Sequence, residues 1–312
     1  MKFSTASISI IVSAVVADAA YTVLQESYTP ANFFSKFDFY TGADPTNGFV
    51  KYIDQASAQS QGIIKTNTDN VYVGVDYTNS APNGRNSVRL ESKARFQRGL
   101  IILDLAHMPG SICGTWPAFW TLGDNWPNNG EIDIIEGVNL NTQNAMALHT
   151  SDGCSINGSG QSGTLISNNC YVYAPNQSTN QGCGSQDTRT TSYGTGFNSI
   201  GGGVYATEWN SDFIKIWFFP RNAIPANVLS ATPEPTSWGT PVAVFQGSCD
   251  IDSKFVSHKI IFDITFCGDW AGNVWGSSGC PTSMTCNDYV ANTPAAFTQT
   301  YWQINSLKVY SS

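Results

Sequence analysis

The chain has 312 residues, of which 41% are hydrophobic, 12% aromatic and only 12% charged. This length permits one large domain or two ordinary ones, and either would bury a substantial core. The formal net charge of −8 and the pI of about 4.7 argue against nucleic acids, anionic membranes and polyanionic substrates as partners, because like charges repel. Neutral ligands remain.

The first residues are typical of a secretory signal peptide. Lys2 precedes an apolar run at 8–17, and small residues follow, with 17–19 as the expected cleavage site. The apolar run is shorter than the roughly 20 residues that a membrane span needs. The last segment, 301–312, is strand-like and lacks the apolar tail of a glycolipid-anchor signal. We therefore expect residues 1–19 to be removed and residues 20–312 to form one secreted domain.

The chain contains 8 cysteines and 3 histidines. An even number of cysteines in a secreted chain predicts disulfides, and eight cysteines allow 105 pairings, among which the sequence does not choose. A structural zinc site is not expected, because no Cys-x-x-Cys pair occurs. Two sequons, at Asn157 and Asn176, predict N-glycosylation in a loop-rich region.

Short runs rich in β-branched and aromatic residues, separated by Gly, Pro and Asn, predict many strands. In chain order they are 71–75, 86–90, 99–104, 114–123, 131–136, 145–150, 204–209, 213–219 and 259–266. The Gly-, Asn-, Ser- and Thr-rich stretch 151–199 predicts a long loop region held by disulfides. Neither a linker nor an internal repeat interrupts the chain, so the pattern predicts an all-β sandwich.

The expected strand 131–136 carries three carboxylates, Glu131, Asp133 and Glu136, among isoleucines. Alternate residues of a strand share a face, so Glu131 and Asp133 lie together. Glu136 is five residues from Glu131, and a regular strand would send it to the opposite face. A β-bulge between Asp133 and Glu136 would absorb one residue and return Glu136 to the face of the other two acids. Like charges on one face repel, which indicates a functional reason for the cluster.

Two carboxylates that flank a scissile bond are the minimum equipment for glycoside hydrolysis. In the retaining reaction one carboxylate attacks the sugar and the other protonates the departing oxygen. We assign Glu131 as the nucleophile and Glu136 as the acid/base. Asp133 is assigned as the hydrogen-bonding partner that tunes the pKa values of these residues. If Glu131 and Asp133 are ionised, their charges hold a proton on Glu136.

The stretch 130–137, Gly-Glu-Ile-Asp-Ile-Ile-Glu-Gly, resembles the bulged active-site strand of glycoside hydrolase family sixteen, specifically its laminarinase-type β-glucanases. The resemblance extends over most of the chain, through 37–46, 86–90, 114–120, 205–209 and 262–272. It implies a β-jelly-roll of two antiparallel sheets with a concave substrate cleft, retaining chemistry, and no catalytic metal or cofactor. The implied substrates are β-1,3-glucan and mixed β-1,3/1,4-glucan, cleaved internally by a secreted monomer.

Aromatic residues in these motifs are candidates for stacking on sugar rings. Trp126 and Trp270 are the strongest candidates. For Trp120 both sugar stacking and core packing remain open, and Trp116 is expected in the core.

Two further polar residues are candidates for substrate binding. His149 follows the carboxylate strand, and the resemblance places it beside the acid/base. Arg89 lies in an otherwise apolar strand and either bonds sugar hydroxyls or pairs with an acid. Arg85, in the preceding turn, is expected to be solvated.

Other hydrolase classes fit poorly. A Gly-x-Ser-x-Gly elbow and paired Asp-Thr/Ser-Gly segments are absent, which argues against serine hydrolases and aspartic proteases. Two alternatives share the predicted fold. One is a transglycosylase that passes the sugar to another sugar. The other is a glucan-binding, lectin-like module, which would leave Glu131 and Glu136 without a role.

Overall fold

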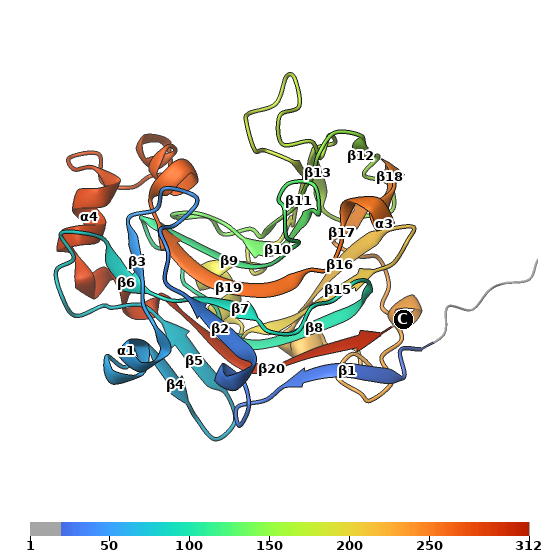
Figure 1. Ribbon diagram of the computed structural model, residues 1–312, viewed down its shortest axis with the longest axis horizontal. Helices are drawn as coiled ribbons and strands as arrows, with labels where there is room; N and C mark the ends of the chain where they lie inside the picture. Colours follow the sequence, from blue (N-terminus) through green and yellow to red (C-terminus); the bar gives the residue numbers. More distant parts are fainter. Residues whose placement is uncertain (1–19, 312) are drawn as a thin grey trace, which may run out of the picture.

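A computed structural model describes residues 20–311, and the expected signal peptide, 1–19, lies outside the described residues. Two antiparallel sheets of eight strands each stack face to face (Figure 1). The arrangement confirms the predicted all-β jelly roll, in which each sheet buries one face against the other. In the described part of the chain, no helix has the length and apolarity to cross a membrane.

The first sheet has the order β17-β16-β15-β8-β20-β5-β4, and β1 pairs with β20. Its strands are β17 (Ala243–Phe245), β16 (Ile214–Pro220), β15 (Gly203–Trp209), β8 (Gly99–His107), β20 (Tyr301–Ser311), β5 (Val71–Gly74), β4 (Ile64–Thr66) and β1 (Val23–Tyr28). The second sheet has the order β13-β14-β11-β10-β9-β19-β7-β2. Its strands are β13 (Thr164–Ser167), β14 (Cys183–Gln186), β11 (Ala145–His149), β10 (Glu131–Glu136), β9 (Thr115–Leu122), β19 (Lys259–Phe266), β7 (Arg89–Ser92) and β2 (Phe37–Tyr40).

Smaller elements lie at the ends of the sheets. Two short strand pairs are β12 (Cys154–Ile156) with β18 (Gly247–Cys249), and β3 (Val50–Tyr52) with β6 (Arg85–Ser87). The α-helices are α1 (Gln55–Ser60), α2 (Gly194–Ser199), α3 (Ile251–Lys254) and α4 (Cys286–Asn292). Single helical turns are η1 (Phe34–Lys36), η2 (Arg221–Ala223), η3 (Pro235–Ser237), η4 (Gly268–Gly272), η5 (Trp275–Ser277) and η6 (Pro294–Gln299).

The predicted strands are present, with two differences. The stretch 86–90 is divided at Val88 between β6 and β7. The stretch 151–199 was predicted as loop, but it contains β12, β13, β14 and α2. These short strands are poor in the residues that favour strands. They form because their backbones pair with neighbours, as β14 does with β11.

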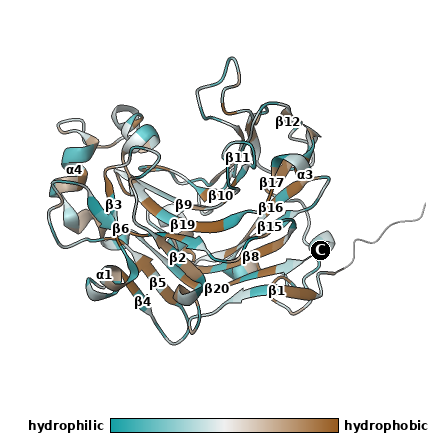
Figure 2. Ribbon diagram, in the orientation of Figure 1, coloured by the Kyte–Doolittle hydropathy of each residue, from teal (hydrophilic) through white to brown (hydrophobic). Residues whose placement is uncertain are grey.

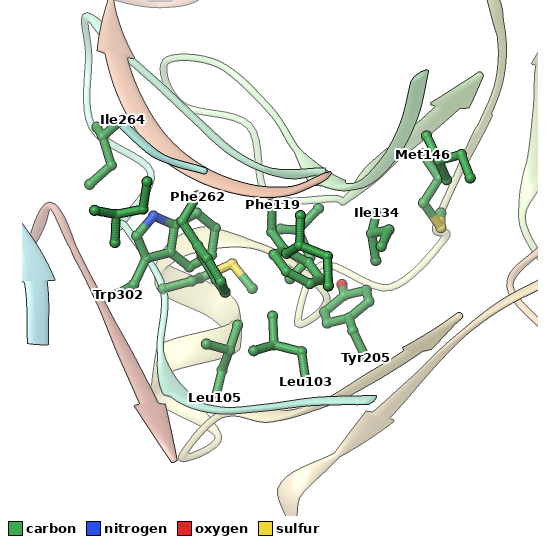
Figure 3. Packing of buried hydrophobic residues seen from close by; sticks show 14 of the residues in the cluster. Leu103, Leu105, Phe119, Ile134, Met146, Tyr205, Phe262, Ile264 and Trp302 are labelled. Carbon is green, nitrogen blue, oxygen red and sulfur yellow. The ribbon is translucent and has the colours of Figure 1, made fainter. Parts of the chain in front are cut away.

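The core lies between the two sheets (Figure 3). Phe119 of β9 and Phe262 of β19 are fully buried, with ring centroids 4.6 Å apart. They face Leu103 and Leu105 of β8 and Trp302 of β20. Burying one such apolar side chain stabilises the fold by about 1.5–3 kcal/mol. Figure 2 shows the hydrophobic segments gathered in the stacked strands and the hydrophilic ones in the surrounding loops. The packed core therefore supplies a rigid floor beneath the opposite face of the second sheet.

Disulfides confirm the prediction from the cysteine count. The pairs are Cys113–Cys280, Cys154–Cys249, Cys170–Cys183 and Cys267–Cys286. Two of them tie the segment around η5 and α4 to the ends of β9 and β19, and another joins β12 to β18. Each such bond typically stabilises a fold by about 2–4 kcal/mol, and these hold loops beside the second sheet.

The predicted bulge in β10 is present. The register against β11 shifts between Asp133 and Glu136, and the register against β9 shifts between Asp133 and Ile135. The extra residue interrupts the backbone hydrogen bonds between β10 and its neighbours. The buried side chain of Asn144 forms hydrogen bonds with two of the backbone groups at the bulge. Its Oδ1 accepts the Glu136 N–H at 3.0 Å, and its Nδ2 donates to the Ile134 carbonyl at 2.8 Å. Asn144 thus clamps the bulge.

Asn144→Ala should lower the free energy of unfolding by about 2–4 kcal/mol, because it leaves two buried backbone groups without partners. Denaturant titration measures this loss. The adjacent exposed variant Thr142→Ala is the control and should stay within about 0.5 kcal/mol of the wild type. A loss at Asn144 no larger than that at Thr142 would contradict the clamp.

Candidate active site

The three carboxylates of β10 lie together on the open face of the second sheet, away from the core. Asp133 is only 2% exposed, whereas Glu131 and Glu136 are half-buried. β10 runs between β9 and β11 in the middle of the sheet, and segments around α4 and around β13 rise at its two sides (Figure 1). The chain enters β10 through Gly130, whose positive φ of 76° and closeness to the Lys254 carbonyl leave no room for a side chain.

Tryptophans lie at both ends of the carboxylate row. Trp126, 37% exposed, hydrogen-bonds Glu131. At the other end the Trp116 indole donates to Glu136 Oε1 at 2.8 Å, and the Trp270 ring meets Trp116 edge to face at 5.7 Å. The expectation that Trp116 belongs to the core was wrong. Trp116 shares its strand face with Trp120, and that face is the open one.

His149 is the register partner of Glu131 across β10 and β11. Its Nε2 lies 3.2 Å from Asp133 Oδ2, and both side chains are buried. The imidazole therefore lies beside Glu131 and Asp133. The expectation that it lies beside the acid/base Glu136 was wrong, because the pairing of β10 with β11 places Ala145, and not His149, opposite Glu136.

Asp263 of β19 is a site residue that the sequence analysis missed. Its carboxylate accepts hydrogen bonds from the Tyr52 hydroxyl at 3.0 Å and from the Trp120 indole at 3.2 Å. Trp120 is the register partner of Asp133, so Asp263 holds the indole beside the carboxylate row. The available signal was a lone acid in an apolar strand, at the alternation position that faces away from the core.

Arg89 lies next to Asp263 in the sheet and is 6% exposed. Its Nε donates to Glu91 at 3.0 Å, and its guanidinium packs on the rings of Tyr40 and Trp120 at 5.0 Å each. Sugar binding and pairing with an acid were the two roles predicted for Arg89, and the structure shows the pairing with an acid, Glu91. Arg89 thereby packs against the Trp120 ring and helps to fix its position.

Arg85 is not solvated, and that expectation was wrong. It is 0% exposed, and its guanidinium donates to the backbone carbonyls of Val290, Asp76 and Asn79. The Phe297 ring lies 4.7 Å from it. Backbone carbonyls satisfy the charge in place of water, so Arg85 connects α4 to β6 and does not reach the carboxylates.

Burial dominates the electrostatics of the carboxylates. It raises the pKa of Glu131 to about 8, with the charge of Asp133 adding to the effect. It likewise raises the pKa of Glu136 to about 8, again with Asp133 adding to it and the Trp116 hydrogen bond opposing it. Burial and the charge of Asp263 raise the pKa of Asp133 to about 8. The raised pKa favours the protonated form of Glu136 at neutral pH, which is the form that the sequence analysis assigns to it. The same burial raises the pKa of Glu131 and Asp133, so burial alone does not produce the predicted difference in ionisation among the three acids.

Two stacked antiparallel sheets with paired carboxylates on one bulged strand are features of a glycoside hydrolase jelly roll. Residues 37–310 match the XgeA-like, catalytic GH16 domain, and the chain belongs to glycoside hydrolase family 16. A probable endo-1,3(4)-β-glucanase of Aspergillus fumigatus is 51% identical over 298 residues, which is 92% of this chain but 45% of that protein. The chain thus spans a little under half the length of this relative.

Two solved structures have the same fold over nearly their whole length. An elongating family 16 β-1,3-glucosyltransferase is 48% identical, with a TM-score of 0.88 over 93% of this chain and 99% of that one. Laminarinase 16A of Phanerochaete chrysosporium, with 6-O-glucosyl-laminaritriose in its donor and acceptor sites, is 42% identical, also with a TM-score of 0.88 and the same coverage. One neighbour is therefore a transferase and the other a laminarinase.

The raised pKa of Asp133 predicts a pH-dependent stability. Its folded pKa of about 8 exceeds the ordinary 3.8, so the folded protein binds more protons between about pH 4 and pH 8, and stability falls as the pH rises through that window. Asp133→Asn removes this penalty. The variant should match the wild type near pH 4 and exceed it by at least about 1 kcal/mol at pH 8, since one pKa unit is about 1.4 kcal/mol.

Thermal unfolding from pH 4 to pH 9 measures the difference. Asp212→Asn, at an exposed position, is the control and should follow the wild type throughout. A stability difference between Asp133→Asn and the wild type that stays constant with pH would refute the buried-acid explanation.

Proposed function

We propose that this chain is a secreted, retaining endo-glycosidase that hydrolyses β-1,3-glucan and mixed β-1,3/1,4-glucan. One observation carries the proposal: the bulge brings Glu131 and Glu136 to the same face of β10, with Asp133 between them. The names of the relatives support β-glucan as the substrate class. A neutral polysaccharide also suits a chain with a net charge of −8.

In the first step Glu131 attacks the anomeric carbon, and the bond from that carbon to the leaving oxygen breaks while Glu136 gives that oxygen its proton. In the second step Glu136 takes a proton from water, and the resulting hydroxide displaces Glu131 from the sugar. Burial raises the pKa of Glu136, which suits the acid role, although the pKa of Glu131 is raised as well. The ester formed at Glu131 removes a negative charge, which eases ionisation of Glu136 for the second step.

We infer that Asp133 and Glu136 hold the protons in the resting state and that Glu131 is ionised. The hydrogen bond from Trp126 and the nearby His149 favour the Glu131 anion. Trp116 and His149 favour the Glu136 anion in the same way, but there the charge of Asp263 opposes them. The charge of Asp263 disfavours the Asp133 anion. A protonated Asp133 can donate to the Glu131 carboxylate and hold it in position for attack.

The substrate would lie along the open face, in contact with Trp126 near Glu131 and with Trp270 beyond Glu136. Trp120, held by Asp263, would support the sugar beside Asp133. Aromatic faces suit the C–H surfaces of β-linked glucose. The four disulfides support secretion, since such bonds persist in oxidising compartments.

A β-glucan transglycosylase is the second candidate, and the 48% identical glucosyltransferase neighbour favours it. It would use the same ester at Glu131, with a sugar hydroxyl in place of water in the second step. A binding module without catalysis is disfavoured, because it gives the buried acids no role.

The wild type should release short oligosaccharides from both laminarin and lichenan, and Glu131→Ala should release essentially none. With azide and an activated aryl β-glucoside oligomer, Glu131→Ala should form the α-glucosyl azide, because azide attacks from the side of the missing carboxylate. Glu136→Ala should instead form the β-glucosyl azide from the ester intermediate. Chromatography and NMR of the products measure both.

Two outcomes would revise the proposal. An absence of new reducing ends from either glucan would overturn the hydrolase. Products longer than the substrate, dominant at modest substrate concentration, would replace it with the transglycosylase. Identical azide anomers from the two variants would contradict the separate roles of Glu131 and Glu136.

Trp116→Phe should shift the alkaline limb of the pH profile of kcat/KM to higher pH. The indole hydrogen bond stabilises the Glu136 anion, so removing it raises the pKa of Glu136 and keeps the acid protonated further into the alkaline range. Trp270→Phe is the control, because it keeps the Trp116 bond. An alkaline limb that stays in place in Trp116→Phe would contradict this coupling.

A further inference from the structure

Glu131, Asp133 and His149 form a compact set of potential ligands at one end of the carboxylate row. One oxygen from each acid and one imidazole nitrogen all lie within 4.8 Å of one another. The pairing of β10 with β11 fixes this arrangement, since Glu131 is opposite His149 and Asp133 is the next residue on the same face. It is the one such group among residues 20–311.

A second observation points to a cation. Asp133 Oδ2 is buried and has no hydrogen-bond partner among the described residues, although His149 Nε2 approaches it to 3.2 Å. A buried carboxylate oxygen without a partner is unfavourable, and a metal ion would satisfy it. This oxygen lies on the His149 side of Asp133, 3.2 Å from the imidazole nitrogen that would be the third ligand.

The donor set selects among metals. One imidazole and two carboxylates suit Zn²⁺, with bonds of about 2.0–2.2 Å and a fourth position left for water. Ca²⁺ requires six to eight oxygens, and Mg²⁺ keeps most of its waters, so neither gains from the imidazole. The half-buried Glu131 leaves a path for the ion from the open face.

We propose that Glu131, Asp133 and His149 form an inhibitory binding site for Zn²⁺. The ion would engage the carboxylate that attacks the sugar, so zinc and glucan would exclude each other. Zinc here is an inhibitor and not a cofactor. The binding stands on the geometry alone, and only the inhibition rests on the proposed function.

Calorimetry with ZnCl₂ in buffer free of chelators tests the binding without any substrate. The wild type should bind one Zn²⁺ per chain and show no comparable heat with MgCl₂. His149→Gln and Glu131→Gln should each weaken binding at least about tenfold, and thermal unfolding checks that both variants are folded.

His107→Gln is the matched control. His107 lies in β8 of the first sheet, and its ring nitrogens contact the Tyr301 carbonyl at 2.9 Å and Gln299 Oε1 at 3.3 Å. This variant should bind Zn²⁺ as the wild type does. The proposal is overturned if the wild type binds no Zn²⁺, if His149→Gln keeps wild-type affinity, or if the loss occurs in His107→Gln instead.

Steady-state kinetics on laminarin test the inhibition. Zn²⁺ should raise the apparent KM while kcat stays unchanged, and EDTA should restore the original KM. Unchanged kinetics with zinc bound would place the ion away from Glu131 and overturn the site. If laminarin is not cleaved even without zinc, the proposed function fails, and the calorimetry still decides the zinc site.

Discussion

One extra residue in β10 brings the three carboxylates of that strand to the open face. Without the bulge, strand alternation would bury Glu136 in the core or turn Glu131 into it, and either would place an unpaired charge among apolar side chains. With the bulge, Ile134 and Ile135 both face the core and the acids face away. The bulge survives because Asn144 satisfies the backbone groups that it frees. A polar side chain one loop away thus sets the geometry of the candidate site.

Gathering acids on this face opposes folding, and the rest of the molecule offsets that cost. Burial raises the pKa values of Glu131, Asp133 and Glu136 together, so the folded state loses stability as each becomes charged. The aromatic core beneath the sheet and the four disulfides beside it supply stabilisation that does not depend on pH. Sites that carry strained electrostatics commonly reside on such rigid scaffolds.

Much of the fold and of the site followed from local sequence patterns. Alternation and turn residues locate the long strands, and the odd spacing of the acids predicts the bulge. The patterns failed where a partner distant in the chain decides the outcome. Arg85 is buried because carbonyls from α4 and from 76–79 surround it, and Asp263 acquires its role from Trp120 on the adjacent strand. The disulfide pairing and the short strand β14 likewise depend on contacts between distant segments.

The same dependence on distant contacts bears on the choice between hydrolysis and transfer. In the mechanism proposed above, both reactions use an ester at Glu131 and a base at Glu136, so β10 would serve either. The difference lies in whether water or a sugar occupies the position next to Glu136 when the ester is attacked. Trp116 and Trp270, which meet edge to face at that end, present an aromatic surface suited to an acceptor sugar. η4, which carries Trp270, is tied to α4 by the Cys267–Cys286 disulfide. Under the proposed mechanism the balance between the two reactions would therefore depend on how firmly this segment holds an acceptor sugar, and not on the carboxylates.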